Sequence, residues 1–322
     1  MSDILKTLSV GSGPAGLTAG IYTGRAGMKP LILAGKAPGG QLTKTSVVEN
    51  YPGFAKGILG PKLMEDMIAQ AQMCGAEFNW ESVTKIEPPK AHGEPFTITD
   101  SADKTFKAHT VIYATGASPR KLGVPGEDPH QPDVGGHGVT YCAVCDGNFF
   151  KKMPVAVVGG GDSAMEEAIY LSKMCSEVTV IHRREIFRAS KVMIERAKST
   201  KNIKWELNSV VEEIIGEQKH GQPTVTSMRL KNTKDNVVKT VKLDGVFVAI
   251  GHIPTTEVLK GVVELDAEGY IKCNESQETN VKGLFAAGDC HDRRYRQAVT
   301  AAGMGCKAAL EAERYLTHEG LA

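Results

Sequence analysis

The sequence lacks any large excess of charge of one sign. Its 38 lysine and arginine residues stand against 37 aspartate and glutamate residues, which gives a formal net charge of +1 at pH 7. This balance excludes a global electrostatic field that would recruit nucleic acid or an anionic membrane. Any site for an anion must therefore be local, and we expect neither a nucleic-acid partner nor a membrane partner.

Long hydrophobic runs are also missing. No segment approaches the roughly 18 apolar residues that a membrane-spanning helix needs. Residues 1–6 lack the basic and apolar blocks of a signal peptide, so we predict a cytoplasmic protein. With 322 residues, of which 41% are hydrophobic, the chain is long enough for two globular domains, each with its own core.

Cysteine is sparse, with seven residues spread over the whole chain. An odd and thinly spread set argues against the disulfide framework of a secreted protein. Only Cys142 and Cys145 are close in sequence. A zinc site would need two further ligands at comparable spacing, and the sequence has no second C-x-x-C or paired-histidine motif, so we predict no metal.

The pair Cys142 and Cys145 suits reversible disulfide chemistry. Residues i and i+3 of a turn have Cα atoms within about 7 Å of each other, which fits the roughly 4.4 to 6.8 Å that a disulfide spans. Asp146 follows directly, and its carboxyl group can move a proton when a thiolate forms or is quenched. The structural alternative for Asp146 is a turn or helix cap before Gly147.

The first forty residues predict a βαβ unit. Residues 5–10 predict a strand, residues 17–26 have helical composition, and residues 30–33 predict a second, buried strand. A glycine motif, GSGPAG at residues 11–16, lies between the first strand and the helix. Its placement favours a nucleotide-binding turn over a plain glycine turn.

The three glycines of this motif have separate roles in such a turn. Gly11 permits the tight turn, Gly13 lets a pyrophosphate approach the backbone, and Gly16 lets helix and strand pack closely. Free amides at the helix N-terminus then face the phosphates. The motif departs from the usual fingerprint at one point, because the second strand ends in residues 34–36, Ala-Gly-Lys, where a ribose-binding acid is expected.

The same pattern returns near the middle of the chain. Residues 155–158 predict a strand, residues 166–174 a helix and residues 178–181 the next strand. The turn after the first of these strands has the spacing Gly159-x-Gly161-x-x-Ala164, and alanine is allowed at its last position.

Basic residues follow the second strand of this repeat, namely His182, Arg183 and Arg184, with Arg188 one turn later. An acid at this place would repel a 2′-phosphate, whereas guanidinium groups form paired hydrogen bonds with its oxygens. The sequence therefore favours NADP over NAD. A solvated charged face is the structural alternative.

Two further segments consist of a buried strand, a glycine and then a proline. Residues 110–116 precede Pro119, and residues 246–251 precede Pro254. We interpret these segments as crossings between two domains.

Together the motifs resemble those of the low-molecular-weight thioredoxin reductases over essentially the whole chain. The resemblance implies an α/β fold of two Rossmann-like dinucleotide-binding domains and a homodimer. Residues 1–117 and 251–322 would form a discontinuous FAD domain, and residues 118–250 an inserted NADPH domain that carries the cysteine pair. The shared blocks, in chain order, are GSGPAG at 11–16, GGQL at 39–42, ENYPG at 49–53, ATG at 114–116, CAVCD at 142–146, GGGDSA at 159–164, HRR at 182–184, GHIP at 251–254, GD at 288–289 and RQA at 296–298.

The resemblance also implies roles for single residues. Cys142 would attack the partner's disulfide, Cys145 would lie against the flavin, and Asp146 would act as the acid. Asp289 would bind ribityl or phosphate oxygens, unless it is an ordinary turn aspartate. The helix that opens at residues 297–298 would point backbone amides at the flavin, where a helix N-terminus stabilises negative charge. The residues expected at FAD are Gly11, Gly13, Pro14, Ala15, Gly16, Gln41, Asn50, Thr115, Gly116, Gly288, Asp289, Arg296, Gln297 and Ala298, and those expected at NADPH are Gly159, Gly161, Asp162, Ser163, Ala164, His182, Arg183, Arg184 and Arg188.

The expected activity is therefore reduction of a thioredoxin or thioredoxin-like disulfide, with electrons passing from NADPH to FAD and then to the disulfide of Cys142 and Cys145. Three alternatives remain: a flavin-dependent dithiol oxidase, a ferredoxin-dependent thioredoxin reductase of the same fold, and a non-catalytic redox sensor. The basic cluster at residues 182–184 argues against the first two, because neither needs NADPH. Steady disulfide reduction would exclude the third.

Overall fold

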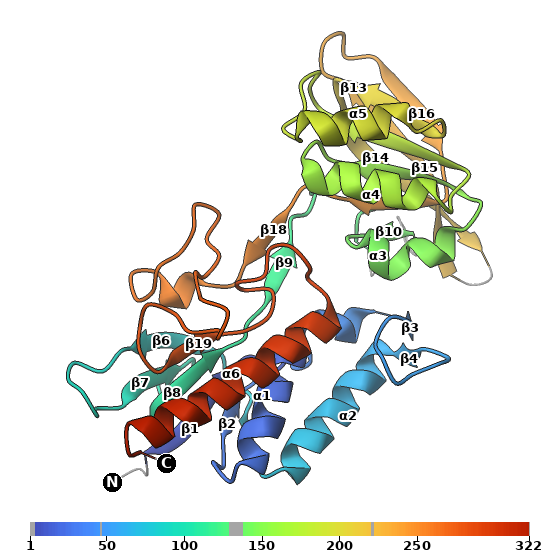
Figure 1. Ribbon diagram of the computed structural model, residues 1–322. Coiled ribbons are helices and arrows are strands. Elements are labelled where there is room, and N and C mark those ends of the chain that lie inside the picture. The colour runs from blue at the N-terminus through green and yellow to red at the C-terminus, as the bar shows by residue number, and fades with distance from the viewer. Residues whose placement is uncertain (1–3, 46, 129–137, 220–221, 322) are drawn as a thin grey trace. The chain divides into compact units, whose positions relative to one another are not determined.

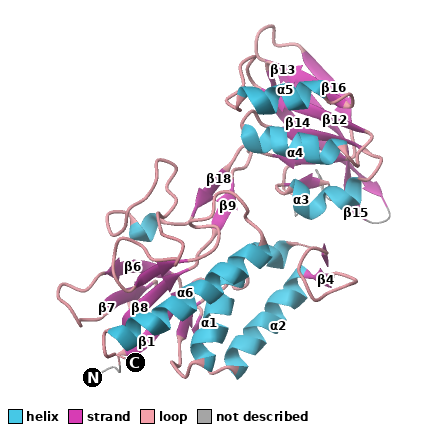
Figure 2. Ribbon diagram, in the orientation of Figure 1, coloured by secondary structure: helices cyan, strands magenta, loops and turns pink. Residues whose placement is uncertain are grey.

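The computed structural model describes residues 4–45, 47–128, 138–219 and 222–321 (Figure 1). The first three residues of the opening segment 1–6 lie outside this range. The chain divides into two compact units, Met1–Ser118 with Ile253–Ala322, and Pro119–His252. Each unit has a sheet with parallel strands at its centre and helices beside it (Figure 2), which confirms the predicted α/β class.

The first unit is built on a seven-stranded sheet. Its order is β5-β2-β1-β8-β7-β6, and β19 pairs with β8. The parallel strands are β1 (Leu5–Val10), β2 (Leu31–Leu33), β5 (Glu77–Asn79), β8 (Thr105–Tyr113) and β19 (Leu284–Ala286), and the antiparallel extension consists of β6 (Val83–Glu87) and β7 (Phe96–Asp100).

Three helices cover this sheet, α1 (Pro14–Arg25), α2 (Gly60–Met73) and α6 (Ala298–His318). The first and the last pack against each other through small residues. A Cβ on Gly305 would lie 2.1 Å from the Ala15 carbonyl oxygen, and a Cβ on Gly288 would lie 3.0 Å from the Ala15 Cβ. This close packing brings the segment before α6 to the first turn of α1, although the two are far apart in sequence.

The second unit has a five-stranded parallel sheet in the order β10-β17-β11-β12-β13. Along β11, Val155 and Val157 face a core with α4, while Ala156 and Val158 face a core with the antiparallel strands. The strand is a continuous apolar run because both of its faces are buried. The elements are β10 (Val139–Thr140), α3 (Ala143–Asp146), β11 (Pro154–Val158), α4 (Asp162–Ser172), β12 (Glu177–His182), α5 (Lys191–Ser199), β13 (Ile203–Leu207), β14 (Ser209–Lys219), β15 (Gln222–Asn232), β16 (Val238–Lys242) and β17 (Gly245–Val248).

Both helices that follow a glycine motif begin earlier than the sequence predicts. Helix α1 begins at Pro14 rather than at residue 17, and α4 begins at Asp162 rather than at residue 166 and ends at Ser172. In each case the N-cap is a glycine, which has no side chain to cap the helix. The last residues of each glycine motif therefore lie in the first helical turn, where the backbone amides are free.

The two chain crossings pair with each other as short strands, β9 (Ala117–Pro119) and β18 (His252–Pro254). None of the helices in the described part of the chain is both long and apolar enough to span a bilayer. The remaining short elements are β3 (Val47–Val48), β4 (Ile58–Leu59), η1 (Gly40–Lys44), η2 (Gly147–Phe150) and η3 (Glu257–Leu259).

Candidate active site

A disulfide joins Cys142 and Cys145, whose Cα atoms are 5.3 Å apart, so the predicted pairing is confirmed. Cys142 is the N-cap of α3, and its Sγ accepts a hydrogen bond from the Cys145 backbone N–H at 3.2 Å. An amide donor at this sulfur stabilises a thiolate there once the disulfide opens. The geometry therefore favours Cys142 as the attacking sulfur.

Asp146 ends α3 and is half-buried. Burial raises the pKa of its carboxyl group, and a hydrogen bond from the Thr140 hydroxyl partly opposes this rise. Asp146 is also the N-cap of η2, but its side chain makes no capping hydrogen bond there. The hydrogen bond expected for a helix-capping role of Asp146 is therefore missing. A carboxyl group that keeps its proton to a higher pH than usual is suited to exchange that proton with a nearby thiolate.

In the first glycine turn, two positions have no room for a side chain and the third position is open. Gly11 has φ of +107°, and a Cβ there would lie 2.3 Å from the Ala114 carbonyl oxygen. A Cβ on Gly16 would lie 1.9 Å from the Gly11 carbonyl oxygen, whereas a Cβ on Gly13 would meet nothing within 4 Å. The space in front of Gly13, at the N-terminus of α1, fits an approaching phosphate.

Residues from distant segments gather around this turn. A Cβ on Gly40 would lie 3.6 Å from the Gly13 Cα, which places the start of η1 beside it. Asn50 Nδ2 donates to Gln297 Oε1 at 3.2 Å, and Gln41 Nε2 donates to the Ala117 carbonyl oxygen at 2.5 Å. The fold therefore joins several of the expected FAD residues within the first unit.

Helix α6 starts beside the same turn, with Gln297 as its N-cap. The Gln297 side chain and the Thr300 hydroxyl form a reciprocal capping box. Arg296, just before the cap, has φ of +49°. The helix start is thus fixed, and its amides are oriented in the way that a negatively charged group requires.

Asp289 and Asp292 are close in sequence but differ in the hydrogen bonds that their carboxyl groups accept. Asp292 accepts hydrogen bonds from the backbone N–H groups of residues 294, 295 and 296 and so holds the turn. Asp289 receives no hydrogen bond from the described residues, and burial, followed by the charge of Asp292, raises its pKa to about 7. A half-buried carboxyl group without a donor suits a ligand that brings hydroxyl groups, as the ribityl chain of FAD does.

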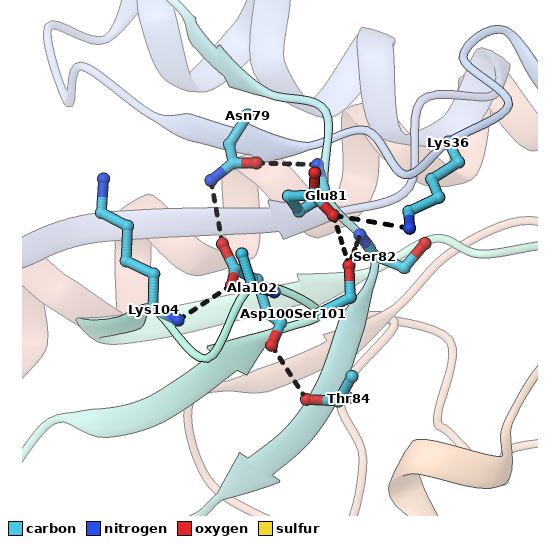
Figure 3. Close-up of polar contacts among 9 residues, drawn as sticks. All are labelled: Lys36, Asn79, Glu81, Ser82, Thr84, Asp100, Ser101, Ala102 and Lys104. Carbon is cyan, nitrogen blue, oxygen red and sulfur yellow. Dashed lines mark hydrogen bonds and ion pairs between the residues drawn. The ribbon is translucent and has the colours of Figure 1, made fainter.

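The segment after β2 contains no acidic residue, but an acidic side chain from the segment after β5 lies beside it (Figure 3). Glu81 follows β5, and its Oε2 lies 3.9 Å from Lys36 Nζ. The neighbouring Asn79 donates to Asp100 Oδ2 at 3.1 Å, which ties this connection to the turn before β8. Sequence reasoning missed Glu81 because only the pairing of β2 with β5 brings it near Lys36.

The second glycine turn repeats the geometry of the first. A Cβ on Gly159 would lie 2.4 Å from the Ala249 carbonyl oxygen, whereas a Cβ on Gly161 would meet nothing within 4 Å. The open position again lies at a helix N-terminus, here that of α4. The remaining motif residues, Pro14, Ala15, Ser163 and Ala164, lie in the first turns of α1 and α4.

His182 lies behind this second turn. A Cβ on Gly160 would lie 2.2 Å from the His182 Cε1, and the ring stacks on Phe187 at 4.9 Å. Its Nε2 is 3.1 Å from the Ile186 carbonyl oxygen. Burial lowers the pKa of His182, and its ring supports the turn, whereas direct contact with a nucleotide stays a prediction.

The arginines next to it are exposed. Arg183, Arg184 and Arg188 form no ion pair within the described part of the chain. The backbone N–H of Arg188 donates to the Gly160 carbonyl oxygen at 2.8 Å, which fixes this segment beside the turn. Asp162 Oδ1 accepts the Ser190 N–H at 2.8 Å and secures the same segment from α4. Three arginines that have no ion pair among the described residues thus lie on the segment that is fixed beside the open phosphate position.

No group of three or more His, Cys, Asp or Glu side chains in the described ranges could hold a metal ion. The first unit offers the open N-terminus of α1 and the raised pKa of Asp289, and the second unit offers the disulfide, the raised pKa of Asp146 and the open N-terminus of α4. This combination suits electron transfer between a bound dinucleotide and a disulfide.

Comparisons with known proteins agree with this geometry. Residues 6–305 match the family described as pyridine nucleotide-disulphide oxidoreductase. The chain is 48% identical over 318 residues to a thioredoxin reductase of Streptomyces clavuligerus, covering 98% of this chain and 95% of that protein. It is 45% identical to a bifunctional thioredoxin reductase/thioredoxin of Mycobacterium leprae, covering 98% of this chain and 67% of that protein.

A solved structure shows the same similarity in three dimensions. The thioredoxin reductase from Giardia duodenalis superposes with a TM-score of 0.88 at 42% sequence identity, covering 97% of this chain and 98% of that chain.

Proposed function

The chain belongs to the pyridine nucleotide-disulphide oxidoreductase family, and within it we propose that the protein is an NADPH-dependent, FAD-containing thioredoxin-disulfide reductase. The observation that carries this proposal is the disulfide of Cys142 and Cys145 with Asp146 beside it. The relatives named above support thioredoxin as the substrate. We also propose a cytoplasmic homodimer.

Two features of the first unit support FAD. The open position at Gly13 leaves room for a pyrophosphate, and Asp289 has a carboxyl group ready for a hydroxyl donor. In the second unit, the open position at Gly161 and the free guanidinium groups of Arg183 and Arg184 support NADPH. When bound, the two groups would together supply the electron pair that reduces the disulfide.

The chain's own residues then perform dithiol exchange. Reduction by two electrons opens the S–S bond and leaves a thiolate on each of Cys142 and Cys145. The Cys142 thiolate attacks the partner's disulfide, so that a new S–S bond forms and the partner's second sulfur leaves as a thiolate. The Cys145 thiolate then attacks the Cys142 sulfur of this mixed disulfide, which restores the internal bond and releases the partner as a dithiol. Asp146 is placed to exchange the proton that the thiolates need.

A coupled assay tests the proposal. Purified protein is mixed with NADPH, a thioredoxin and a chromogenic disulfide, and the absorbance is followed. We expect steady turnover with thioredoxin present and none with Cys142→Ser. Flavin reduction by NADPH without disulfide turnover would favour the redox sensor. Turnover at a rate that does not depend on NADPH would favour an enzyme that uses another electron donor or acceptor.

A further inference from the structure

We propose that Glu127 is a positioning residue for the redox turn. Its carboxylate holds the side chain of Tyr141, the residue directly before Cys142, and thereby keeps the two cysteines close together after the disulfide opens. The inference rests on the proposed redox role of the pair of Cys142 and Cys145. All of the residues involved belong to the second unit.

Glu127 is a buried acid, with only 3% of its surface exposed. Its Oε1 accepts the Leu122 N–H at 2.7 Å and the Tyr141 hydroxyl at 3.1 Å, and its Oε2 accepts the Gly123 N–H at 2.7 Å. A buried carboxylate is tolerated only where donors of this kind replace water. The three bonds therefore fix both carboxylate oxygens in place.

The backbone that carries Glu127 is anchored independently. Gly126 has φ of +80°, and a Cβ there would lie 1.8 Å from the Ile214 carbonyl oxygen. The Ile214 N–H donates to the Pro125 carbonyl oxygen at 2.9 Å. The segment thus packs directly against β14. The position of the Glu127 backbone is therefore fixed by the sheet, and its side chain holds Tyr141 from a rigid support.

The other end of this link is the redox turn. Burial, followed by the charge of Glu127, raises the pKa of Tyr141, so its hydroxyl remains a donor at every pH at which the protein would work. Next to it, the Thr140 Oγ1 accepts the Cys142 N–H at 3.2 Å, and the Thr140 hydroxyl donates to Asp146. Tyr141 therefore lies between Thr140 and Cys142 and restrains the backbone of both.

This restraint matters most in the reduced state. The disulfide itself holds the Cα atoms of Cys142 and Cys145 5.3 Å apart, but after reduction only the single turn of α3 and the contacts around it can do so. Keeping two thiols close raises their effective concentration toward each other. Closure of the dithiol then becomes more favourable, which makes the pair a better reductant of its partner.

The experiment measures the thiol–disulfide equilibrium of the holoenzyme in dithiothreitol redox buffers. Free thiols at Cys142 and Cys145 are alkylated and quantified by mass spectrometry. We expect Glu127→Gln to lower the equilibrium constant for dithiol closure by about tenfold, which equals about 30 mV toward a more oxidising pair. Tyr141→Phe, which keeps the ring, should shift the equilibrium in the same direction by a smaller factor.

Asp100→Asn is the matched control (Figure 3). Asp100 is 1% exposed and likewise accepts three hydrogen bonds, from the Asn79 side-chain amide and the backbone N–H groups of Ala102 and Lys104, but it lies in the first unit. It should lower the melting temperature without moving the thiol equilibrium.

An unchanged equilibrium in both Glu127→Gln and Tyr141→Phe would overturn the proposal and leave Glu127 a stability residue. An equal shift in Asp100→Asn would also overturn it. Since this measurement needs neither NADPH nor thioredoxin, a failure of the proposed function would appear separately, in the coupled assay.

Discussion

Asn50 and Gln297 are separated by 247 positions in the sequence, yet the Asn50 amide donates a hydrogen bond to the Gln297 side chain at 3.2 Å. Gln297 also caps α6, so this bond joins the segment after η1 to the start of the last helix. The two chain segments that make up the first unit, Met1–Ser118 and Ile253–Ala322, therefore meet beside the first glycine turn. At this meeting point we propose that FAD binds, with its pyrophosphate in front of Gly13.

The alanine variants at two glycines of the first turn should behave in opposite ways. Gly13→Ala should fold normally, because the new Cβ meets no atom within 4 Å, but it should lose FAD because the Cβ occupies the space that a pyrophosphate needs. Gly16→Ala should be destabilised by about 1–3 kcal/mol, because its Cβ would lie 1.9 Å from a carbonyl oxygen. Flavin absorbance of the purified proteins and thermal melting distinguish the two effects. Full flavin occupancy in a stable Gly13→Ala protein would show that this turn does not hold the pyrophosphate.

The exposed arginines should determine the choice between NADPH and NADH. We expect the double variant Arg183→Ala with Arg184→Ala to lower kcat/KM for NADPH by roughly 100-fold or more, since each hydrogen bond to a charged group contributes about 1.5–3 kcal/mol and each loss of about 1.4 kcal/mol is tenfold. The value for NADH, which has no 2′-phosphate, should stay nearly constant. Arg196→Ala, an exposed arginine on α5, is the control. An equal loss for both nucleotides would mean that the cluster does not read the phosphate.

Local patterns in the sequence were sufficient for the strands of both nucleotide-type units. Strands β1 and β11 are short segments followed directly by a glycine motif, and they occur where the sequence predicts them. The starts of α1 and α4 were predicted too late, because Pro14 and Gly16 in α1, and Asp162 and Ser163 in α4, have poor intrinsic helical propensity although they suit a first helical turn. The physical requirement at those positions is a free amide, which composition does not show.

Contacts between distant segments could not be predicted from the sequence. Nothing near Glu127 indicates that it meets Tyr141, and nothing near Glu81 indicates that it meets Lys36. His182 shows the same limit, because the sequence groups it with the arginines that follow, whereas the fold buries its ring behind Gly160. Motifs predict which chemistry is present, and tertiary packing decides which side chains face it.

Asp289 should make the stability of the flavin-free protein depend on pH. Its pKa is raised from 3.8 to about 7 in the folded state, mainly by burial, so the folded protein binds a proton that the unfolded chain has already released. The resulting stabilisation is fully present below about pH 4 and is lost as the pH rises toward 7, with an amplitude on the order of a few kcal/mol. Denaturant unfolding of the flavin-free protein and of Asp289→Asn measures this effect. The difference between the two proteins should change over this interval, and a constant difference would refute the assignment.

Trapping should separate the roles of the two cysteines. In Cys145→Ser, Cys142 can attack the thioredoxin disulfide, but no second thiol is present to resolve the product, so a mixed disulfide should accumulate. Cys142→Ser should trap much less, because the amide hydrogen bond that stabilises a thiolate is made to the Cys142 sulfur. Non-reducing gel electrophoresis after incubation with oxidised thioredoxin detects the complex once each variant has been reduced with dithiothreitol and desalted. Accumulation in Cys142→Ser instead would reverse the roles.

Asp146 should impose a falling limb on the pH profile of thioredoxin reduction. Burial raises the pKa of its carboxyl group, so the group that supplies a proton is fully protonated at low pH and loses that proton as the pH rises through the raised value. The rate of the exchange step should decline over the same interval. Asp146→Asn cannot donate this proton, and we expect kcat to fall by about 10²-fold and the limb to disappear.

Thr140→Val provides an independent check on the same group. The Thr140 hydroxyl donates to Asp146 and holds the pKa of its carboxyl group below the value that burial alone would give. Removing the hydroxyl should therefore move the falling limb to higher pH while leaving a substantial maximal rate. If the limb stays in place in Thr140→Val and persists in Asp146→Asn, another group supplies the proton, and the role of Asp146 is limited to the structure of the redox turn.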